Sequence, residues 1–137
     1  MRLLTHNILQ CNKKGVTNGY PLIIRPVEMK YEESAFDKDF TASMIPKIEY
    51  GALLKALTEV RGAAKFTGAE AMPEGGPPAL PDEFREEYKS DDGFLRKLHV
   101  ALFDLHLVEG KLVCPESGRE FPVEKGIPNM LLNDDEV

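Results

Sequence analysis

The apolar positions follow two patterns, which divide the chain into a strand-rich start, a helical centre and a strand-rich end. At the start, residues 2–4 and 20–26 predict short strands, and the prolines that bound the second suit strand ends. At the end, residues 111–114 and 119–123 predict a hairpin, and a further apolar run covers residues 127–132. Because short strands rarely fold alone, we expect both ends of the chain to form one sheet.

Apolar stripes predict helices in the centre. Residues 36–44 place apolar side chains at every fourth position, with Ser34 as the expected N-cap and Pro46 as the end. A second stripe covers residues 53–60, and a third runs over residues 92–107. The third stripe spans much of the helix circumference, which is typical of a helix packed on more than one side.

Together these elements predict an α+β fold, with a small antiparallel sheet formed by both termini and a helical insertion in the middle. The β domain is then discontinuous, over residues 1–34 and 108–137, and the insertion covers residues 35–107. Within the insertion, residues 66–81 are rich in Gly, Pro and Ala, so they predict a flexible linker or a long loop.

The composition of the chain excludes several classes of function but says little about the fold. The net charge is −6, whereas a protein that grips phosphates directly usually has a basic surface. The chain lacks the roughly 18 consecutive apolar residues of a membrane span, and its first residues do not read as a secretory signal. With 2 cysteines and no export signal, we expect a reduced chain in the cytoplasm and nucleus.

The two ends of the sequence carry a family resemblance. The opening MRLLTHNILQCNKKGV and the closing LVCPESGREFPVEKGIPNMLL resemble the ends of the multifunctional methyltransferase activator subunit family, named after tRNA methyltransferase subunit one-one-two. An LLTHN start, a CPESGR turn and a GIPNMLL terminus occur in the family's order, and the central MIPKIEY segment agrees in placement. The resemblance implies that the sheet is zinc-ribbon-like.

The resemblance also implies a function. Members of this family are non-catalytic subunits that form heterodimers with class I methyltransferases, which they activate and stabilise. The substrates of those enzymes include tRNA, rRNA and a translation termination factor. The partner holds the S-adenosylmethionine, so no cofactor is expected in this chain, and RNA is expected to be reached only through the complex.

The cysteines depart from the fuller family pattern. Some members carry one cysteine pair where this chain has Cys11 and Val16, and a second pair where it has Cys114 and Ser117. A structural zinc site takes four protein ligands, and His6 could at most add a third to the two thiols. We therefore expect no bound zinc, with Cys11 and Cys114 as buried remnants of a four-cysteine site.

The closing apolar run is the candidate interaction surface. In a small sheet only alternate side chains face the core, so some of Ile127, Met130, Leu131 and Leu132 are expected to point outward. A partner strand would bury them and pair with the open sheet edge. The alternative, in which all four pack inside the chain's own core, stays open from the sequence alone.

The resemblance adds the N-terminal segment to this surface. For Asn7 and Asn129, hydrogen bonds within local turns are as good an explanation as partner contact. The residues expected to contact the partner are Thr5, Asn7, Ile8, Phe121, Ile127, Pro128, Asn129, Met130, Leu131 and Leu132.

An independent enzyme is one competing interpretation. His99 and His106 are seven residues apart in the third apolar stripe, so a helix would place them on one face, with Asp104 nearby. Such a group could serve acid–base catalysis or metal binding. No nucleophile motif, Gly-rich phosphate loop or complete metal-ligand set accompanies it, so we do not expect catalysis.

A degenerate zinc-ribbon module that binds RNA directly is the alternative function. Lys13, Lys14, Arg119 and Lys125 could form a modest basic patch near the terminal sheet. The acidic overall balance and the lack of an evident aromatic stacking platform argue against this interpretation.

Overall fold

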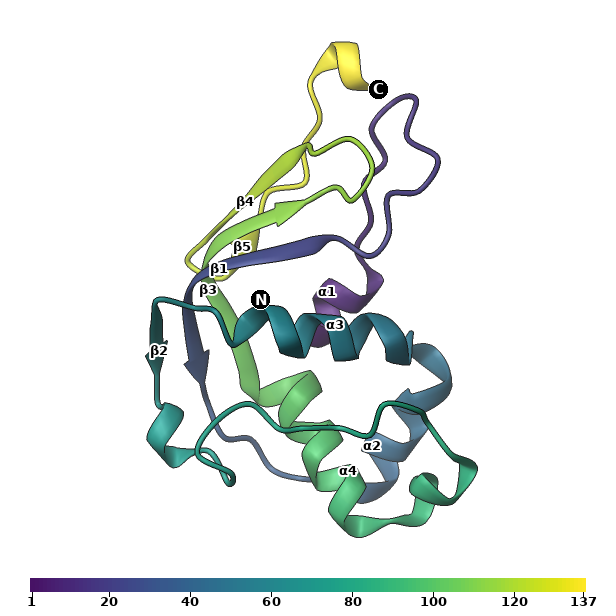
Figure 1. Cartoon of the computed structure of the whole chain (residues 1–137), viewed down its shortest axis with the longest axis vertical. Helices are drawn as coiled ribbons and strands as arrows, with labels where there is room; N and C mark the ends of the chain where they lie inside the picture. The colour runs from purple at the N-terminus through teal and green to yellow at the C-terminus, as the bar shows by residue number, and fades with distance from the viewer.

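A five-stranded sheet connects the part of the molecule around the C-terminus to a group of helices at the other end (Figure 1). The computed structural model describes residues 1–137. Its α-helices and strands are α1 (Leu3–Ile8), β1 (Ile23–Tyr31), α2 (Lys38–Met44), α3 (Tyr50–Val60), β2 (Lys65–Thr67), α4 (Asp92–His99), β3 (Leu105–Val113), β4 (Glu120–Glu124) and β5 (Ile127–Pro128). A π-helical turn covers Val100–Asp104, and 3-10 turns cover Ile45–Lys47, Ala69–Ala71, Glu86–Ser90 and Asp134–Glu136.

The strand order is β2-β1-β3-β4-β5, and every neighbouring pair is antiparallel except β1 with β2. The long central pair is β1 with β3, which runs from Ile23 opposite Val113 to Tyr31 opposite Leu105, with a bulge at Val27. The predicted α+β class is confirmed, and so is the single sheet shared by both ends of the chain. The strands from the two ends of the chain are antiparallel, as predicted, and β2, from the central insertion, adds an unpredicted parallel strand at one edge.

The segment 66–81, predicted as a linker or a long loop, begins inside strand β2. Phe66 pairs with Met29 of β1, and its half-buried ring packs against the core. Gly68 then turns the chain with φ +80°, and a Cβ there would lie 2.8 Å from the Tyr31 carbonyl oxygen. The prediction is therefore wrong for the first residues of the segment, because a Gly/Pro-rich composition does not reveal a strand whose hydrogen bonds come from β1.

Helix α3 confirms the second predicted stripe. It ends at Val60, shortly before Gly62, as the sequence predicts. Its buried face packs against β1 and supplies much of the core between the helices and the sheet. The buried residues of α3 are Ala52, Leu53, Ala56, Leu57 and Val60.

The third predicted helix is shorter than expected. Helix α4 ends at His99, the π-helical turn Val100–Asp104 follows, and β3 begins at Leu105. Every residue of the π-helical turn is buried. A continuous buried run has no period that separates a helix from a strand, so the pairing of β3 with β1 decides the structure.

The predicted first strand, residues 2–4, is also wrong. Arg2 forms only an isolated bridge to His106, and helix α1 begins at Leu3. The helix buries Leu3, His6 and Asn7, which share one face. Because two of these three residues are polar, an apolar pattern does not reveal this helix.

Helix α2 starts later than predicted. Asp37, not Ser34, is the N-cap, because the Asp37 side chain accepts a hydrogen bond of 3.0 Å from the Phe40 N–H. Pro46 ends the α-helix as expected, by opening a 3-10 turn after Met44. Ser34 lies in the preceding loop, where it contacts α4 and the π-helical turn.

Candidate functional site

An apolar surface lies at the open edge of the sheet, beside strand β5. Ile127 is 70% exposed, Leu131 is 80% exposed, and Ile8 at the end of α1 is 69% exposed. Next to Ile8 lies a hollow of about 260 Å³, which we call the edge groove, and neither Ile127 nor Leu131 lines it. It is lined by Ile8, Leu9, Gln10, Asn12, Phe121, Met130 and Leu132.

The backbone at this edge is free to pair with another chain. The turn at Lys125 and Gly126, with φ of +52° and +77°, brings β5 back against β4, as the sequence predicts. β5 has only 2 residues, and the chain beyond it leaves the ladder. The N–H and C=O groups of Met130 and Leu132 form no hydrogen bond within the chain. A strand added to a sheet edge pairs with the unbonded backbone groups of alternate residues, as at Met130 and Leu132.

Arg119 fixes the segment that carries these residues. Its Nε donates to Glu136 Oε2 at 2.7 Å, and its Nη2 donates to Glu136 Oε1 at 3.1 Å and to the Leu131 carbonyl at 3.3 Å. The guanidinium also lies 4.8 Å from the centre of the Phe121 ring. The hydrogen bond from Arg119 is the main reason that the pKa of Glu136 falls to about 2.

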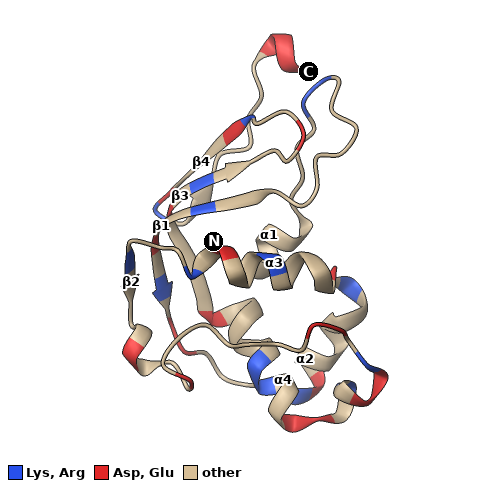
Figure 2. Ribbon diagram, viewed as in Figure 1, with Lys and Arg blue, Asp and Glu red and all other residues tan.

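The same contacts change the predicted basic patch. The Lys13 ammonium lies 3.9 Å from Glu136, so both Lys13 and Arg119 face a carboxylate of the C-terminal turn. Figure 2 shows this acidic turn next to the basic stretch of the loop that follows α1. The charge available for phosphate contact at this end of the molecule is therefore reduced.

The structure brings most of the predicted contact residues together. Phe121 is buried beneath the edge groove, and Met130 and Leu132 are half-buried along it. Asn129 is exposed and accepts a hydrogen bond from the Leu131 N–H at 3.1 Å, so its side chain makes a local turn. Pro128 is half-buried in β5.

Asn7 and Thr5 lie differently from the rest. The Asn7 amide is buried and bonds both backbone groups of Glu49, with distances of 3.0 Å and 2.9 Å, so it joins α1 to the start of α3. Thr5 is half-buried on α1 and does not line the edge groove. The lining residues that the sequence analysis missed, Leu9, Gln10 and Asn12, directly follow Ile8 in the chain, which was the available signal.

The cysteines do not form a four-ligand metal site. Cys11 and Cys114 are buried free thiols that contact one another, and the Ser117 N–H donates to Cys114 Sγ at 3.3 Å. Burial raises the pKa of Cys11, whereas at Cys114 the effect of burial is outweighed by hydrogen bonds from Ser117, which lower the pKa. His6 Nε2 is bound to the Leu22 carbonyl at 2.7 Å. The residues present thus do not fit a structural zinc ion, and no cluster of three or more metal-ligating side chains occurs in residues 1–137.

The histidine pair considered for catalysis is not on one face. His99 lies at the end of α4, and His106 lies in β3. His99 Nε2 is 3.1 Å from Ser34 Oγ and 3.5 Å from Asp104 Oδ1, so one ring nitrogen faces both partners. A Ser-His-Asp triad uses the two different nitrogens of the ring, and this cluster therefore lacks triad geometry.

An α+β fold whose apolar groove borders a free strand edge defines a class of protein that works by binding another chain. The chain belongs to the Trm112p-like family, whose model matches residues 2–126. A relative from Arabidopsis thaliana, multifunctional methyltransferase subunit TRM112 homolog A, is 50% identical over 137 residues and is covered, like this chain, over 100% of its length. The Mus musculus multifunctional methyltransferase subunit TRM112-like protein is 42% identical over 100% of this chain and 98% of its own.

A solved structure supports the fold. The chain is similar to one from the Encephalitozoon cuniculi Mtq2–Trm112 complex, described as methylating the translation termination factor eRF1, with a TM-score of 0.55 and 18% identity. The likeness covers 96% of this chain and 95% of that one, and at this identity it shows the fold alone. None of the helices is both long and apolar enough to cross a membrane.

Proposed function

We propose that this protein is a non-catalytic subunit that binds, stabilises and activates S-adenosylmethionine-dependent methyltransferases. The observation that carries the proposal is the edge groove, where exposed apolar side chains border the free backbone of Met130 and Leu132. The relatives named as multifunctional methyltransferase subunits supply the kind of partner. The partners proposed here, as heterodimers, are enzymes that modify tRNA, rRNA and a translation release factor.

The groove offers both parts of a strand-addition interface. A strand laid along residues 129–132 would pair with the backbone groups of Met130 and Leu132, and its side chains would cover the groove. Burial of one Leu or Met side chain stabilises a complex by about 1.5–3 kcal/mol, so several apolar contacts together offset the cost of association. The partner would also gain, because an apolar strand edge of its own would be covered.

Activation follows from linkage between binding and folding. A subunit that binds only the folded methyltransferase shifts that enzyme toward its folded state, and cofactor affinity rises if the same contact orders the cofactor site. In this proposal S-adenosylmethionine is held by the partner, and this chain holds neither a cofactor nor zinc. RNA contacts then arise within the complex, in the cytoplasm and the nucleus.

The test uses the full chain and a methyltransferase that co-purifies with it. We expect the enzyme to have a higher melting temperature and a lower Kd for S-adenosylmethionine when this chain is bound, and the chain alone to transfer no methyl group to tRNA. Equal stability and equal cofactor affinity with and without the chain would refute the proposal. Salt-dependent, tight RNA binding by the isolated chain would instead support the RNA-binding alternative.

A further inference from the structure

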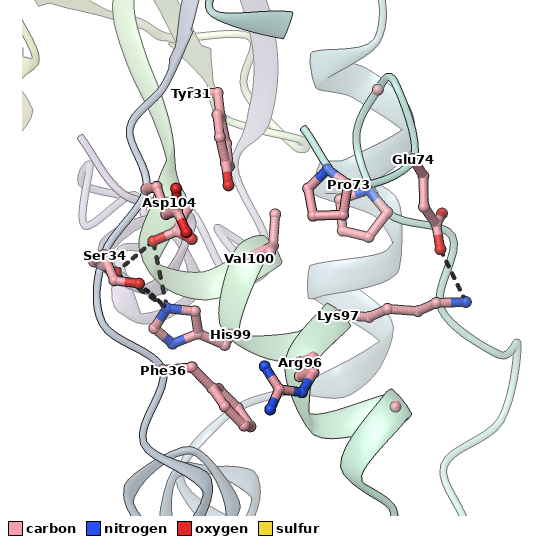
Figure 3. A pocket seen from close by; sticks show the side chains of 14 residues that line it. Tyr31, Ser34, Phe36, Pro73, Glu74, Arg96, Lys97, His99, Val100 and Asp104 are labelled. Atoms are coloured by element: carbon pink, nitrogen blue, oxygen red, sulfur yellow. Dashed lines mark hydrogen bonds and ion pairs between the residues drawn. The ribbon is translucent and has the colours of Figure 1, made fainter. Parts of the chain in front are cut away.

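A second hollow, of about 410 Å³, lies at the opposite end of the molecule from the edge groove, between α4 and the loop after β1 (Figures 1 and 3). Its size falls within the range of about 300–1,000 Å³ that is typical of small-molecule sites. Pro73 and Pro78, from the segment expected to be a flexible linker, form part of one wall. Asp104, the last residue of the π-helical turn, also lines this cavity.

Asp104 is only 1% exposed, yet its carboxylate is incompletely satisfied. Its Oδ1 accepts a hydrogen bond of 2.5 Å from Ser34 Oγ, whereas its Oδ2 has no hydrogen-bond partner within the chain. Because Ser34 donates its one proton to Asp104, the contact of 3.1 Å between Ser34 Oγ and His99 Nε2 makes His99 the donor. The same ring nitrogen also lies 3.3 Å from the Ser34 carbonyl oxygen and 3.5 Å from Asp104 Oδ1.

The other charges around the cavity do not compensate Asp104. Arg96 is paired with Asp92 at 2.8 Å and lies over the Phe36 ring, and Lys97 is paired with Glu74 at 3.1 Å. Glu33, which also lines the cavity, has no ion-pair partner. The cavity thus holds a surplus of negative charge.

Tyr31 adds a second polar group inside the cavity. The residue is 9% exposed, and its hydroxyl forms no hydrogen bond within the chain. Figure 3 shows this hydroxyl pointing into the space between Asp104 and Val100. Burial, followed by the nearby Asp104 and Glu33 carboxylates, raises the pKa of Tyr31, so the hydroxyl stays protonated. Asp104 Oδ2 and the Tyr31 hydroxyl therefore have no hydrogen-bond partner within the chain, and both residues line the same cavity.

We propose that this cavity is a binding site for an ammonium or guanidinium group, separate from the methyltransferase interface. The N–H donors of the ligand bind Asp104 Oδ2 and the Tyr31 hydroxyl oxygen, and its apolar stem lies against Phe36 and Val100. The same chemistry is offered by a small free amine and by a lysine or arginine side chain of another protein. This inference goes beyond the proposed function, and neither depends on the other.

The experiment is an NMR titration of the ¹⁵N-labelled full chain with n-butylammonium, n-butylguanidinium, the neutral analogue n-butanol, and the peptide acetyl-Gly-Lys-Gly-amide. We expect saturable shifts of the backbone amides in 31–36 and 96–104 with the cations, and much weaker binding of n-butanol. Binding of the amines without the peptide would identify a small free amine as the ligand, and binding of the peptide would identify a protein side chain. No saturable shift with any cation, or equal affinity for n-butanol, would overturn the proposal.

Variants separate recognition from folding. Asp104→Asn should weaken cation binding about tenfold or more, because it removes a charge-assisted hydrogen bond. Glu33→Gln, at an exposed position without an ion pair, leaves the fold intact and should weaken binding several-fold. Glu32→Gln is the matched control, since Glu32 is the next residue along the chain and does not line the cavity. The proposal would also be overturned if Glu33→Gln binds the cations with unchanged affinity and a folded Asp104→Asn variant does the same. Co-purification of a methyltransferase should be unaffected by all three variants.

Discussion

Replacement of Leu131 by alanine should separate partner binding from folding at the exposed apolar surface next to the edge groove. The Leu131 side chain is 80% exposed, so the isolated chain gains little stability from it. Its backbone N–H and C=O, which bond Asn129 and Arg119, are kept in the variant. We therefore expect the free energy of unfolding of Leu131→Ala to stay within about 0.5 kcal/mol of the wild-type value.

The expected loss of affinity follows from the area that a partner would cover. Because 80% of Leu131 is open to solvent, nearly the whole side chain is available for burial on binding. Leucine differs from alanine by three carbon atoms, and each buried CH₂ group contributes about 0.8 kcal/mol, which gives about 2 kcal/mol. At about 1.4 kcal/mol for each tenfold change, the Kd for the methyltransferase should rise about 30-fold.

Isothermal titration calorimetry against a co-purifying methyltransferase measures this change, and urea denaturation of the free chain measures folding. Val27→Ala is the matched control, because Val27 is also an exposed apolar residue, at 56%, but lies at the bulge of β1, which β3 and β4 separate from β5. The reasoning is refuted if Leu131→Ala binds as tightly as the wild type, or if Val27→Ala loses as much affinity.

Further predictions concern the stability of the chain and the residues that hold the edge groove and its neighbouring elements in place. Phe121→Ala removes the buried floor of the groove and should lower the free energy of unfolding by about 3–5 kcal/mol in urea denaturation. Asn7→Ala leaves both backbone groups of Glu49 without their partner and should cost about 1–3 kcal/mol, a result that an unchanged urea midpoint would contradict. Burial lowers the pKa of His6 below 6.5, so its contribution to stability is complete above pH 6.5 and is lost as the pH falls through the lower, folded-state pKa. The pKa of Glu136 is lowered from 4.5 to about 2, so its contribution to stability is present above pH 4.5 and is lost as the pH falls toward 2. Urea midpoints plotted against pH should therefore fall over this range in the wild type, and Glu136→Gln should remove that fall.

The sequence predicted the sheet edge well because the information there is local. The turns at 115–118 and 125–126 fix two reversals, and the apolar run after them is too dense for alternate burial in a small sheet. The outward position of Ile127 and Leu131 follows from that density, and the structure confirms it. The alternative in which the whole run packs into the chain's own core is therefore wrong.

The errors arise where distant contacts decide the local structure. The run 100–107 is apolar almost throughout, so only pairing with β1 shows where the helix stops. Strand β2 exists because β1 offers it an edge, which the composition of 66–81 does not reveal. The bond between Arg119 and Glu136 joins residues 17 positions apart, and no periodic pattern predicts it. The same holds for Asn7, whose partner Glu49 lies in another element.

An apolar surface on a small protein stays open only if the chain cannot fold it inward, and the Arg119 contacts provide that restraint. Arg119 holds the carbonyl of Leu131 on one side and Glu136 on the other, so Leu131 cannot turn toward the core without breaking charge-assisted hydrogen bonds. A segment already held in place loses less conformational entropy when a partner strand pairs with it. The charged residues next to the edge groove therefore favour binding by keeping the groove in shape, and the apolar residues supply most of the contact energy.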